Sequence, residues 1–308
     1  MIKIKVITDS SAGFSKEEAL KYNVTVLPLT LSYDNKDYLD GIDITTDEFY
    51  KMFFENQERR GLARLDVLGL FSKDEKGFPK TSMVTPPKFE EEYKKILEEG
   101  YTPVVIPISK KLSGTLQSAI IARDMLDNPE DVIVEDSQSA LGAVKVMIKA
   151  LLMKEYETKE DVIKEIDYLR KHLNFYAVPE TLAYLAKGGR LGKFSARVGN
   201  FLHFKPVIQL DFEGVLVPID KPRGLKHAFK AIDNYLSVNE IDFNYPVEFG
   251  YSTKEENVNA LIEACKSKLV GEYTIGQISP VVGVHVGPGA SALFYIAKNE
   301  VNKKLKKD

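Results

Sequence analysis

The chain has 308 residues, of which 44% are hydrophobic and 28% are charged, an ordinary composition for a soluble globular protein with one large domain or two. A net charge of −3 and a pI near 6.0 argue against a nucleic acid as the principal partner. The single cysteine, Cys265, excludes an intrachain disulfide and a cysteine-based metal site. Because the sequence shows neither a signal-peptide pattern nor a bilayer-spanning apolar stretch, we expect a cytoplasmic protein.

The first half of the chain repeats one pattern three times: a short apolar run, a turn containing serine, and a helical period. The three copies are "IKIKVITDSSAGFSKEEALKY" from residue 2, "PVVIPISKKLSGTLQSAIIARDML" from residue 103 and "DVIVEDSQSALGAVKVMIKALLMKEY" from residue 131. Such alternation predicts βαβ units and a parallel sheet. Ligands of parallel sheets bind beyond the carboxyl ends of the strands, so the three serine turns are expected to lie at one crevice.

The pattern changes near residue 157. An amphipathic helix begins there, and "PVIQLDFEGVLVPI" at 206–219 predicts a β-hairpin. We therefore predict an α/β protein with two domains: a parallel-sheet βαβ, Rossmann-like domain over 1–156, and a mixed α/β domain over 157–308. The segment 56–78 interrupts the first domain, and we interpret it either as a tolerated surface insertion or as a cover for a pocket or a partner contact.

The turn Ser113-Gly114-Thr115 precedes one of the predicted helices. Ser and Thr commonly cap helices by accepting hydrogen bonds from free backbone N–H groups, which alone explains their presence. A helix start after a glycine turn also binds anions. The residues by themselves leave both interpretations open.

Three further motifs carry candidate binding groups. Thr81 and Ser82 lie in "KTSMVTPP", where turn chemistry alone accounts for hydroxyl residues. His285 begins "HVGPGA", a glycine-rich turn after the strand-like "PVVGV". Arg190 follows the helix-ending Gly-Gly of "LAKGGRLGK", and its guanidinium suits a carboxylate or a phosphate.

Arg223 in "DKPRGLKHAF" is a second candidate cation before a predicted helix. Motifs for a nucleophile elbow, a phosphate-binding P-loop and a zinc protease are absent from the sequence. We expect neither a metal nor a cofactor.

Taken in order, "ITDSSAGF", "PKTSMVTP", "ISKKLSGTLQSA", "VEDSQSALGA", "VPETLAYLAKGGRLG", "FKPVIQLDFEGVL" and "HVGPGA" resemble the DegV family of bacterial fatty-acid-binding proteins, which includes the acyl-carrying subunit of fatty acid kinase. The resemblance runs from residue 2 to about residue 297. It implies two α/β domains with an acyl pocket at their junction. Met83 departs from it, because the family has a polar residue at that position.

The resemblance also implies roles for the candidate residues. The carboxylate would be bound by the hydroxyls of Thr81 and Ser113 with the Gly114 backbone and His285, and Ser82 and Thr115 belong to the same group. Arg190 would lie beside the head group, and Arg223 would face the head group or a partner.

The function expected from these features is that of a non-catalytic carrier. It would hold a long-chain fatty acid and present the carboxylate to the catalytic subunit of a fatty acid kinase for phosphorylation to acyl phosphate, with transient membrane contact during fatty-acid exchange. Two alternatives stay open: an acyl hydrolase or transferase using Ser113 and His285, and a phosphotransfer protein using His285.

Overall fold

The computed structural model describes residues 1–59, 78–192 and 204–301. The predicted α/β class is confirmed, with a parallel sheet in the N-terminal half and a mixed sheet in the C-terminal half. Most of the 56–78 insertion lies outside the described residues, so its interpretation stays a prediction, although residues up to Arg59 continue a helix. In the described parts of the chain, no helix combines the length and the apolar character needed to cross a membrane.

Three sheets organise the molecule. The parallel sheet has the order β2 (Thr25–Leu27), β1 (Ile4–Asp9), β6 (Thr102–Val105), β7 (Ile133–Val134). The mixed sheet has the order β10 (Leu216–Asp220), β9 (Val207–Leu210), β8 (Leu173–Val178), β13 (Ser291–Ile296), β11 (Glu248–Tyr251), β12 (Thr274–Gln277). A small antiparallel sheet has the order β4 (Lys36–Leu39), β3 (Thr30–Tyr33), β5 (Lys80–Ser82).

The helices lie on both sides of the two larger sheets. They are α1 (Lys16–Lys21), α2 (Thr46–Arg59), α4 (Pro86–Glu98), α5 (Thr115–Asp124), α6 (Gly142–Leu151), α7 (Lys159–His172), α8 (Ala183–Lys187), α9 (Leu225–Leu236), α10 (Glu255–Cys265) and α11 (Pro280–Val286). Short 3₁₀ turns are η1 (Ser10–Ala12), η2 (Pro129–Asp131) and η4 (Lys266–Lys268).

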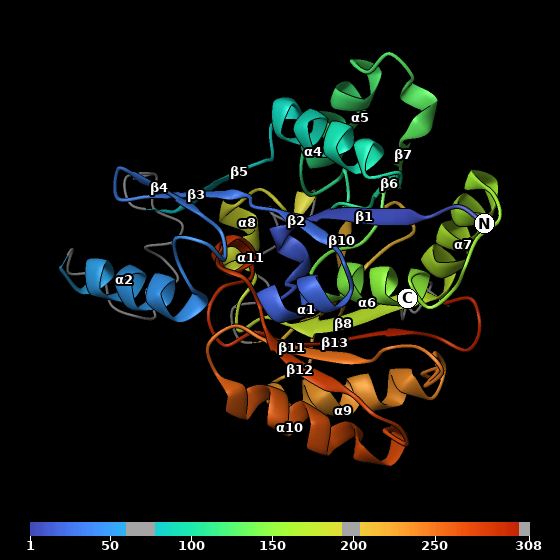
Figure 1. The fold of residues 1–308 in the computed structure, drawn as a ribbon. Coiled ribbons are helices and arrows are strands. Elements are labelled where there is room, and N and C mark those ends of the chain that lie inside the picture. The colour runs from blue at the N-terminus through green and yellow to red at the C-terminus, as the bar shows by residue number, and fades with distance from the viewer. Residues whose placement is uncertain (60–77, 193–203, 302–308) are drawn as a thin grey trace.

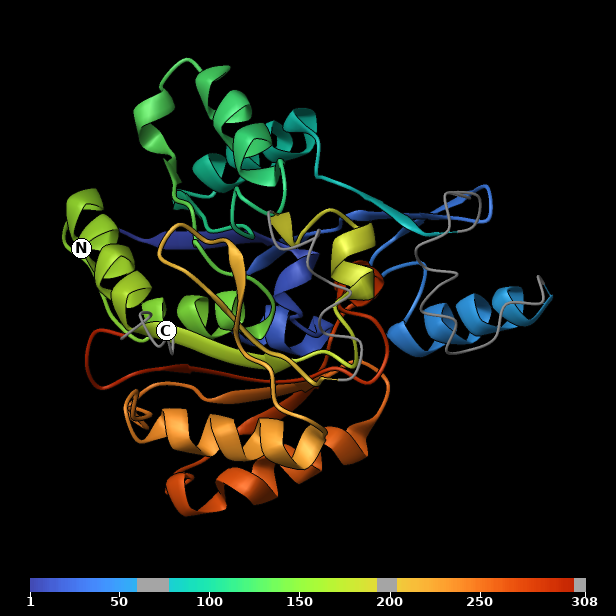
Figure 2. The same cartoon turned by 180° about the vertical axis from the view of Figure 1, so that it is seen from behind.

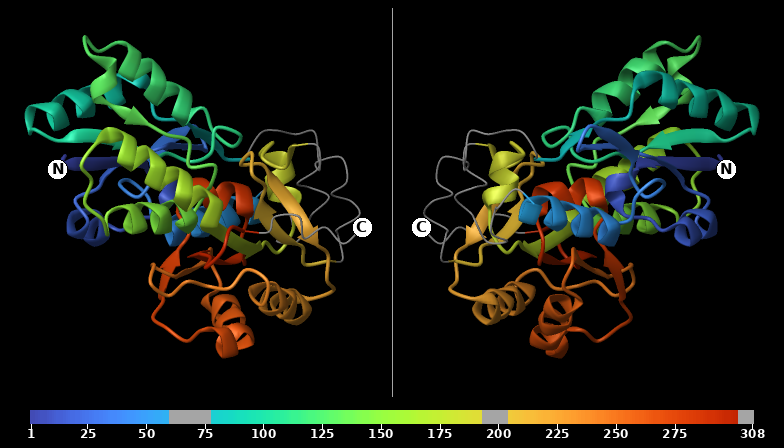
Figure 3. Two further views of the ribbon diagram at one scale, coloured as in Figure 1. Left: turned by 90° about the vertical axis from the view of Figure 1, so that its right-hand side faces the viewer. Right: turned by 90° about the vertical axis from the view of Figure 1, so that its left-hand side faces the viewer.

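The main body has five layers, which Figure 1 shows from top to bottom. Helices α4 and α5 cover the outer face of the parallel sheet, α1 and α6 lie between the two sheets, and α9 and α10 cover the outer face of the mixed sheet (Figures 1 and 3). The continuous apolar pattern of β1 fits this burial, because Val6 and Ile7 are fully buried.

Helix α6 forms the middle layer. All ten of its residues are buried, and it packs against β8, β11 and β13 of the mixed sheet although it belongs to the first half of the chain. One continuous apolar core therefore includes residues from both halves. The domain division at residue 156 stays a prediction.

The small sheet and α2 extend from one side of this body (Figure 1). Strand β5 pairs with β3 at Leu31↔Thr81, which fixes the position of the "KTS" motif. Helices α8 and α11 lie between this sheet and the body, and α11 contacts α2, α8, β3 and β5. This junction contains an apolar pocket.

The prediction of a strand at "PVVGV" is wrong, because residues 280–286 form helix α11. Pro280 occupies the first helical turn, and Asp40 Oδ1 accepts the Val281 N–H at 3.2 Å. Gly287, at φ +77°, ends the helix. Nearly every side chain of α11 is buried, so the apolar run has no alternation that distinguishes a helix from a strand.

The predicted hairpin at 206–219 is confirmed as β9 and β10. Seen from behind, it rises from the mixed sheet toward the loop that follows β6 (Figure 2). Ser109 Oγ in that loop donates to the Gly214 carbonyl at 3.0 Å. A Cβ on Gly214 would lie 2.2 Å from Ser109 Oγ, so the hairpin tip needs glycine to approach this closely.

Candidate functional site

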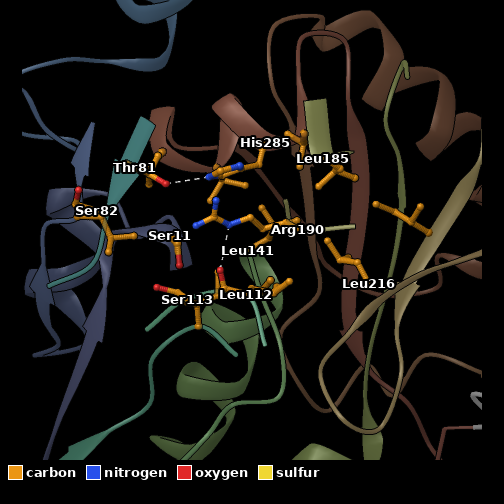
Figure 4. A pocket seen from close by; sticks show the side chains of 17 residues that line it. Ser11, Thr81, Ser82, Leu112, Ser113, Leu141, Leu185, Arg190, Leu216 and His285 are labelled. Atoms are coloured by element: carbon orange, nitrogen blue, oxygen red, sulfur yellow. Dashed lines mark hydrogen bonds between the residues drawn. The ribbon is translucent and has the colours of Figure 1, made fainter. Parts of the chain in front are cut away.

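The candidate site is an apolar pocket between the parallel sheet, α11 and the β9–β10 hairpin (Figure 4). It encloses about 690 Å³ of space not occupied by atoms, including the part open to solvent. Its apolar lining consists of Leu29, Ile108, Leu112, Ala140, Leu141, Leu185, Ile208, Leu216, Val281, Val282 and Val286. Its polar lining consists of Ser11, Thr81, Ser82, Ser113, Arg190 and His285. Such a lining suits an amphipathic ligand with a long apolar part and one polar end.

Thr81 and His285 form the direct contact between β5 and α11. Thr81 Oγ1 lies 2.9 Å from His285 Nε2. His285 Nδ1 is buried and has no partner among the described residues. Since an unpaired buried N–H costs more than an unpaired lone pair, we assign the proton to Nε2, which then donates to Thr81. The Thr81 hydroxyl hydrogen is thereby left to donate to a ligand in the pocket.

The His285 ring is held in a tight and desolvated position. Burial, and to a lesser degree the positive charge of Arg190, lower the pKa of His285 to about 3, so the ring is neutral near pH 7. A Cβ on Gly188 would lie 2.2 Å from His285 Nδ1. Only glycine at position 188 therefore allows the ring to lie against the end of α8.

Arg190 is positioned by the end of α8. The Arg190 N–H donates to the Leu185 carbonyl, the Gly189 N–H donates to the Ala186 carbonyl, and Gly189 has φ +75°. These bonds form a Schellman motif, which confirms that the Gly-Gly pair ends the helix. The guanidinium then donates to the carbonyls of Leu112 and Gly188. It carries its charge into the pocket without a carboxylate partner among the described residues (Figure 4).

Ser113 lies in the pocket wall, but it is not the residue at the helix N-cap. Gly114 occupies that position and α5 begins at Thr115. Ser113 Oγ lies 2.9 Å from Thr115 Oγ1 and accepts the Thr115 N–H at 3.3 Å. The hydrogen bond from the Thr115 N–H to Ser113 Oγ is that of a serine turn, which begins one residue before the N-cap Gly114. This bond holds the Ser113 hydroxyl beside the pocket.

Ser11 belongs to the pocket, although sequence reasoning did not select it. Asp9 accepts hydrogen bonds from the Ser11 hydroxyl and backbone N–H, and from the Ile108 N–H at 2.9 Å. Burial raises the pKa of Asp9, against the effect of these hydrogen bonds. The signal available in the sequence was "DSS" directly after a strand, at the same sheet edge as Ser113.

The expected convergence of three serine turns is met in part. Ser11 and Ser113 both line the pocket, whereas the third turn contributes the apolar Ala140 and Leu141 instead of its serines. Leu141 has φ +59°, and it precedes α6 directly.

The remaining predicted residues lie at different distances from the pocket. Ser82 lines it. Thr115 is buried behind Ser113, and Gly114 lies against Met83, whose Sδ would be 2.5 Å from a Cβ at position 114. Arg223 is exposed, lies 5.5 Å from the centre of the Phe204 ring and does not line the pocket.

The geometry differs from that of a nucleophile–base–acid triad. The hydroxyl beside His285 Nε2 belongs to Thr81, while the Ser113 hydroxyl is bonded to Thr115. No carboxylate of the described residues accepts from His285 Nδ1. Ser113 and His285 therefore do not form a nucleophile–base pair in this structure.

Comparison with known proteins identifies relatives over nearly the whole chain. The family described as "Uncharacterised protein, DegV family" matches residues 3–61 and 70–298. A DegV domain-containing protein of Caldanaerobacter subterraneus subsp. tengcongensis is 31% identical over 301 residues, covering 97% of this chain and all of the relative. A similar relative from Clostridium acetobutylicum is 32% identical over 307 residues, covering 97% of this chain and all of the relative.

Solved structures show the same fold. A fatty-acid-binding DegV family protein of Streptococcus agalactiae superposes with a TM-score of 0.82 at 25% identity, covering 97% of this chain and all of that one. A DegV family protein of Thermus thermophilus, described by its fatty acid binding, gives 0.80 at 29% identity over 96% of this chain and all of that one. A stearic-acid-binding protein of Eubacterium ventriosum gives 0.78 at 28% identity over 97% of this chain and 99% of that one.

Proposed function

This chain belongs to the DegV family, and we propose that it binds one long-chain fatty acid with the acyl chain in the apolar pocket and the carboxylate at Thr81 and Ser113, while His285 holds the Thr81 hydroxyl in place. The observation that carries the proposal is the single polar end of an otherwise apolar pocket. Ser11 and Ser82 add hydroxyls at this end, and Arg190 supplies the positive charge. The solved relatives that bind fatty acids support the ligand class.

The two parts of the ligand would contribute differently to binding. At about 0.8 kcal/mol per buried CH₂, a chain of roughly 16 carbons gains on the order of 10 kcal/mol of gross transfer free energy. The head group contributes less, because its hydrogen bonds replace bonds to water. The Thr81 hydroxyl, which the neutral His285 ring orients, and the half-buried Arg190 would offset the cost of desolvating the carboxylate.

We further propose that the chain is a carrier and not an enzyme by itself, and that a fatty acid kinase subunit phosphorylates the bound carboxylate to acyl phosphate. The residues at the polar end of the pocket support this proposal, because Thr81, Arg190 and His285 also line a second, more polar hollow. In this proposal the chain acts in the cytoplasm and needs no cofactor. It contacts a membrane only transiently, while the ligand is exchanged.

Ligand binding is tested by gentle extraction of the purified protein and mass spectrometry of the released lipid. We expect one long-chain fatty acid per chain, and binding of added palmitate after delipidation. A delipidated protein that remains folded and fails to bind palmitate would refute the proposal.

The kinase step needs a separate assay. The palmitate-loaded protein is incubated with ATP and a candidate kinase subunit, and acyl hydroxamate is measured after trapping with hydroxylamine. We expect product only when both proteins and ATP are present. Product formed by this chain and ATP alone would show instead that the chain is itself a kinase.

A further inference from the structure

A second hollow adjoins the apolar pocket at the head-group residues. It encloses about 770 Å³ including open solvent, and it is lined by Phe78, Pro79, Lys80, Thr81, Lys187, Gly188, Arg190 and His285. Thr81, Arg190 and His285 also line the acyl pocket. The two hollows therefore meet at the proposed site of the carboxylate.

The charge of this hollow has one sign. Lys80, Lys187 and Arg190 line it, and its described lining contains neither Asp nor Glu. His285 adds no charge near neutral pH, because burial lowers its pKa to about 3. Three cations and no acidic residue on the described lining of one hollow favour a ligand group with more than one negative charge.

The two lysines are supplied by the elements that also position the head-group residues. Lys80 directly precedes Thr81 in β5, and Lys187 is the last residue of α8, immediately before Gly188. Lys187 Nζ lies 5.3 Å from the centre of the Phe78 ring, and both residues belong to the lining of the hollow. The described residues offer no ion-pair partner to either lysine.

We propose that Lys80, Lys187 and Arg190 form a phosphoryl-binding site, which holds the phosphate of the acyl phosphate product next to the acyl pocket. This inference rests on the proposed function. In the reaction, a carboxylate oxygen supplies an electron pair to the γ-phosphorus of ATP, the bond from that phosphorus to the bridging oxygen breaks, and ADP leaves with the electron pair. The bound head group thereby changes from one negative charge to about two near neutral pH.

The site distinguishes product from substrate by this added charge. Arg190 neutralises a carboxylate bound at Thr81, whereas the phosphoryl group would extend beyond the carboxylate toward Lys80 and Lys187. The lysines should therefore matter little for palmitate and strongly for the phosphorylated form, because charge-assisted hydrogen bonds are stronger than neutral ones.

The probe is a stable analogue of the acyl phosphate, a 2-oxoalkylphosphonate with a chain matching that of palmitate. Its affinity and that of palmitate are measured by calorimetry for the wild type, Lys80→Gln, Lys187→Gln and the double variant. Lys88→Gln, an exposed lysine on α4 outside both hollows, is the matched control. We expect the double variant to lose about 10-fold or more in phosphonate affinity, while palmitate affinity changes less than about twofold.

The outcomes separate this inference from the proposed function. Equal affinities of wild type and double variant for the phosphonate would overturn the phosphoryl site while leaving fatty-acid binding intact. An equal loss for both ligands would also overturn it, because the lysines would then act on the pocket in general. Failure of the wild type to bind palmitate would refute the proposed function and this inference together.

Discussion

Two polar clusters of the molecule differ in how their charges are matched. Between α1, α6 and β11, Lys145 and Lys149 face Glu18 and Glu248, with N–O distances of 2.6–3.7 Å. Two positive and two negative groups balance there. At the polar end of the apolar pocket, the Arg190 guanidinium has only carbonyl partners among the described residues, and the Thr81 hydroxyl hydrogen is left free by the assigned His285 tautomer. Matched charges fit a structural role, whereas an unmatched cation and a free hydroxyl donor indicate a place for an anion.

The sharpest test of this contrast is Glu248→Gln. Glu248 and both lysines are almost fully buried, so removing one negative charge leaves an uncompensated positive charge. We expect the free energy of unfolding in urea to fall by about 3–5 kcal/mol, with palmitate binding retained by the folded fraction. Glu240→Gln breaks an exposed pair with Lys298 at 2.7 Å and should change stability much less. Similar losses in both variants would contradict the structural role of the buried cluster.

Gly188→Ala should affect the head-group region instead. The added Cβ would lie 2.2 Å from His285 Nδ1, so the ring must move and its contact with Thr81 breaks. We expect palmitate affinity to fall by about 10–100-fold, the scale of losing one hydrogen bond to a charged group. Calorimetric titration measures the loss. Gly100→Ala, in a turn at φ +78° with no atom near its Cβ position, should lower stability and leave the affinity unchanged.

Glu18 makes the stability contributed by the buried Lys–Glu cluster depend on pH. Burial opposes its ionisation, but Lys145 and Lys149 lower its pKa to about 2 from the ordinary 4.5. The stability that this shift contributes is complete above pH 4.5 and is lost as the pH falls toward 2. We expect Glu18→Gln, which can keep the capping box of α1, to cost about 1–2 kcal/mol at pH 7 after solvent screening. Urea denaturation across pH should show the difference from wild type shrinking below pH 4.5; a constant difference would point to packing alone.

Thr81→Val should have the smallest effect. It removes the hydroxyl that contacts His285 and, by our tautomer assignment, donates to the carboxylate. A loss of about 5–10-fold in palmitate affinity is expected, less than the full value of a hydrogen bond to a charged group, because Ser11, Ser82 and Ser113 leave other hydroxyls in the pocket lining. Thr81→Ser keeps the hydroxyl and should restore most of the affinity. If valine and serine at this position bind palmitate equally well, Thr81 does not hold the head group.

Several features could be predicted from sequence because local chemistry determines them. The strand–turn–helix units, the β9–β10 hairpin and the Gly-Gly helix end at residues 188–189 all follow from residue patterns. The order of the motifs also indicated the DegV family, which the comparisons confirm. The polar end of the pocket could be anticipated from the position of serine turns at one sheet edge.

Other features depend on contacts between distant segments. Helix α11 reads as a strand because all but one of its residues are buried, so its side chains show no helical period. The contact between Thr81 and His285 joins residues 204 positions apart. The apolar residues of the pocket are ordinary core residues in sequence, and only the packing of the hairpin and α11 against the sheet edge makes them a pocket.

Arg223 illustrates a different limit. A cation before a helix has the same local pattern whether it enters a pocket or faces solvent. In the structure it is exposed beside Phe204, outside both hollows at the head group. Its expected role toward a head group or partner stays a prediction.

The buried middle helix constrains how an acyl chain can be exchanged. A hinge that swung the two sheets apart would hydrate α6, whose ten residues are all buried, at about 25 cal/mol for every Å² of apolar surface. By contrast, the tip of the β9–β10 hairpin is joined to the loop after β6 by the bond between Ser109 and Gly214 and by an ion pair between Lys111 and Glu213 at 3.6 Å. Small displacements of surface elements are therefore the less costly route, and loading and unloading should leave the relative orientation of the two large sheets unchanged.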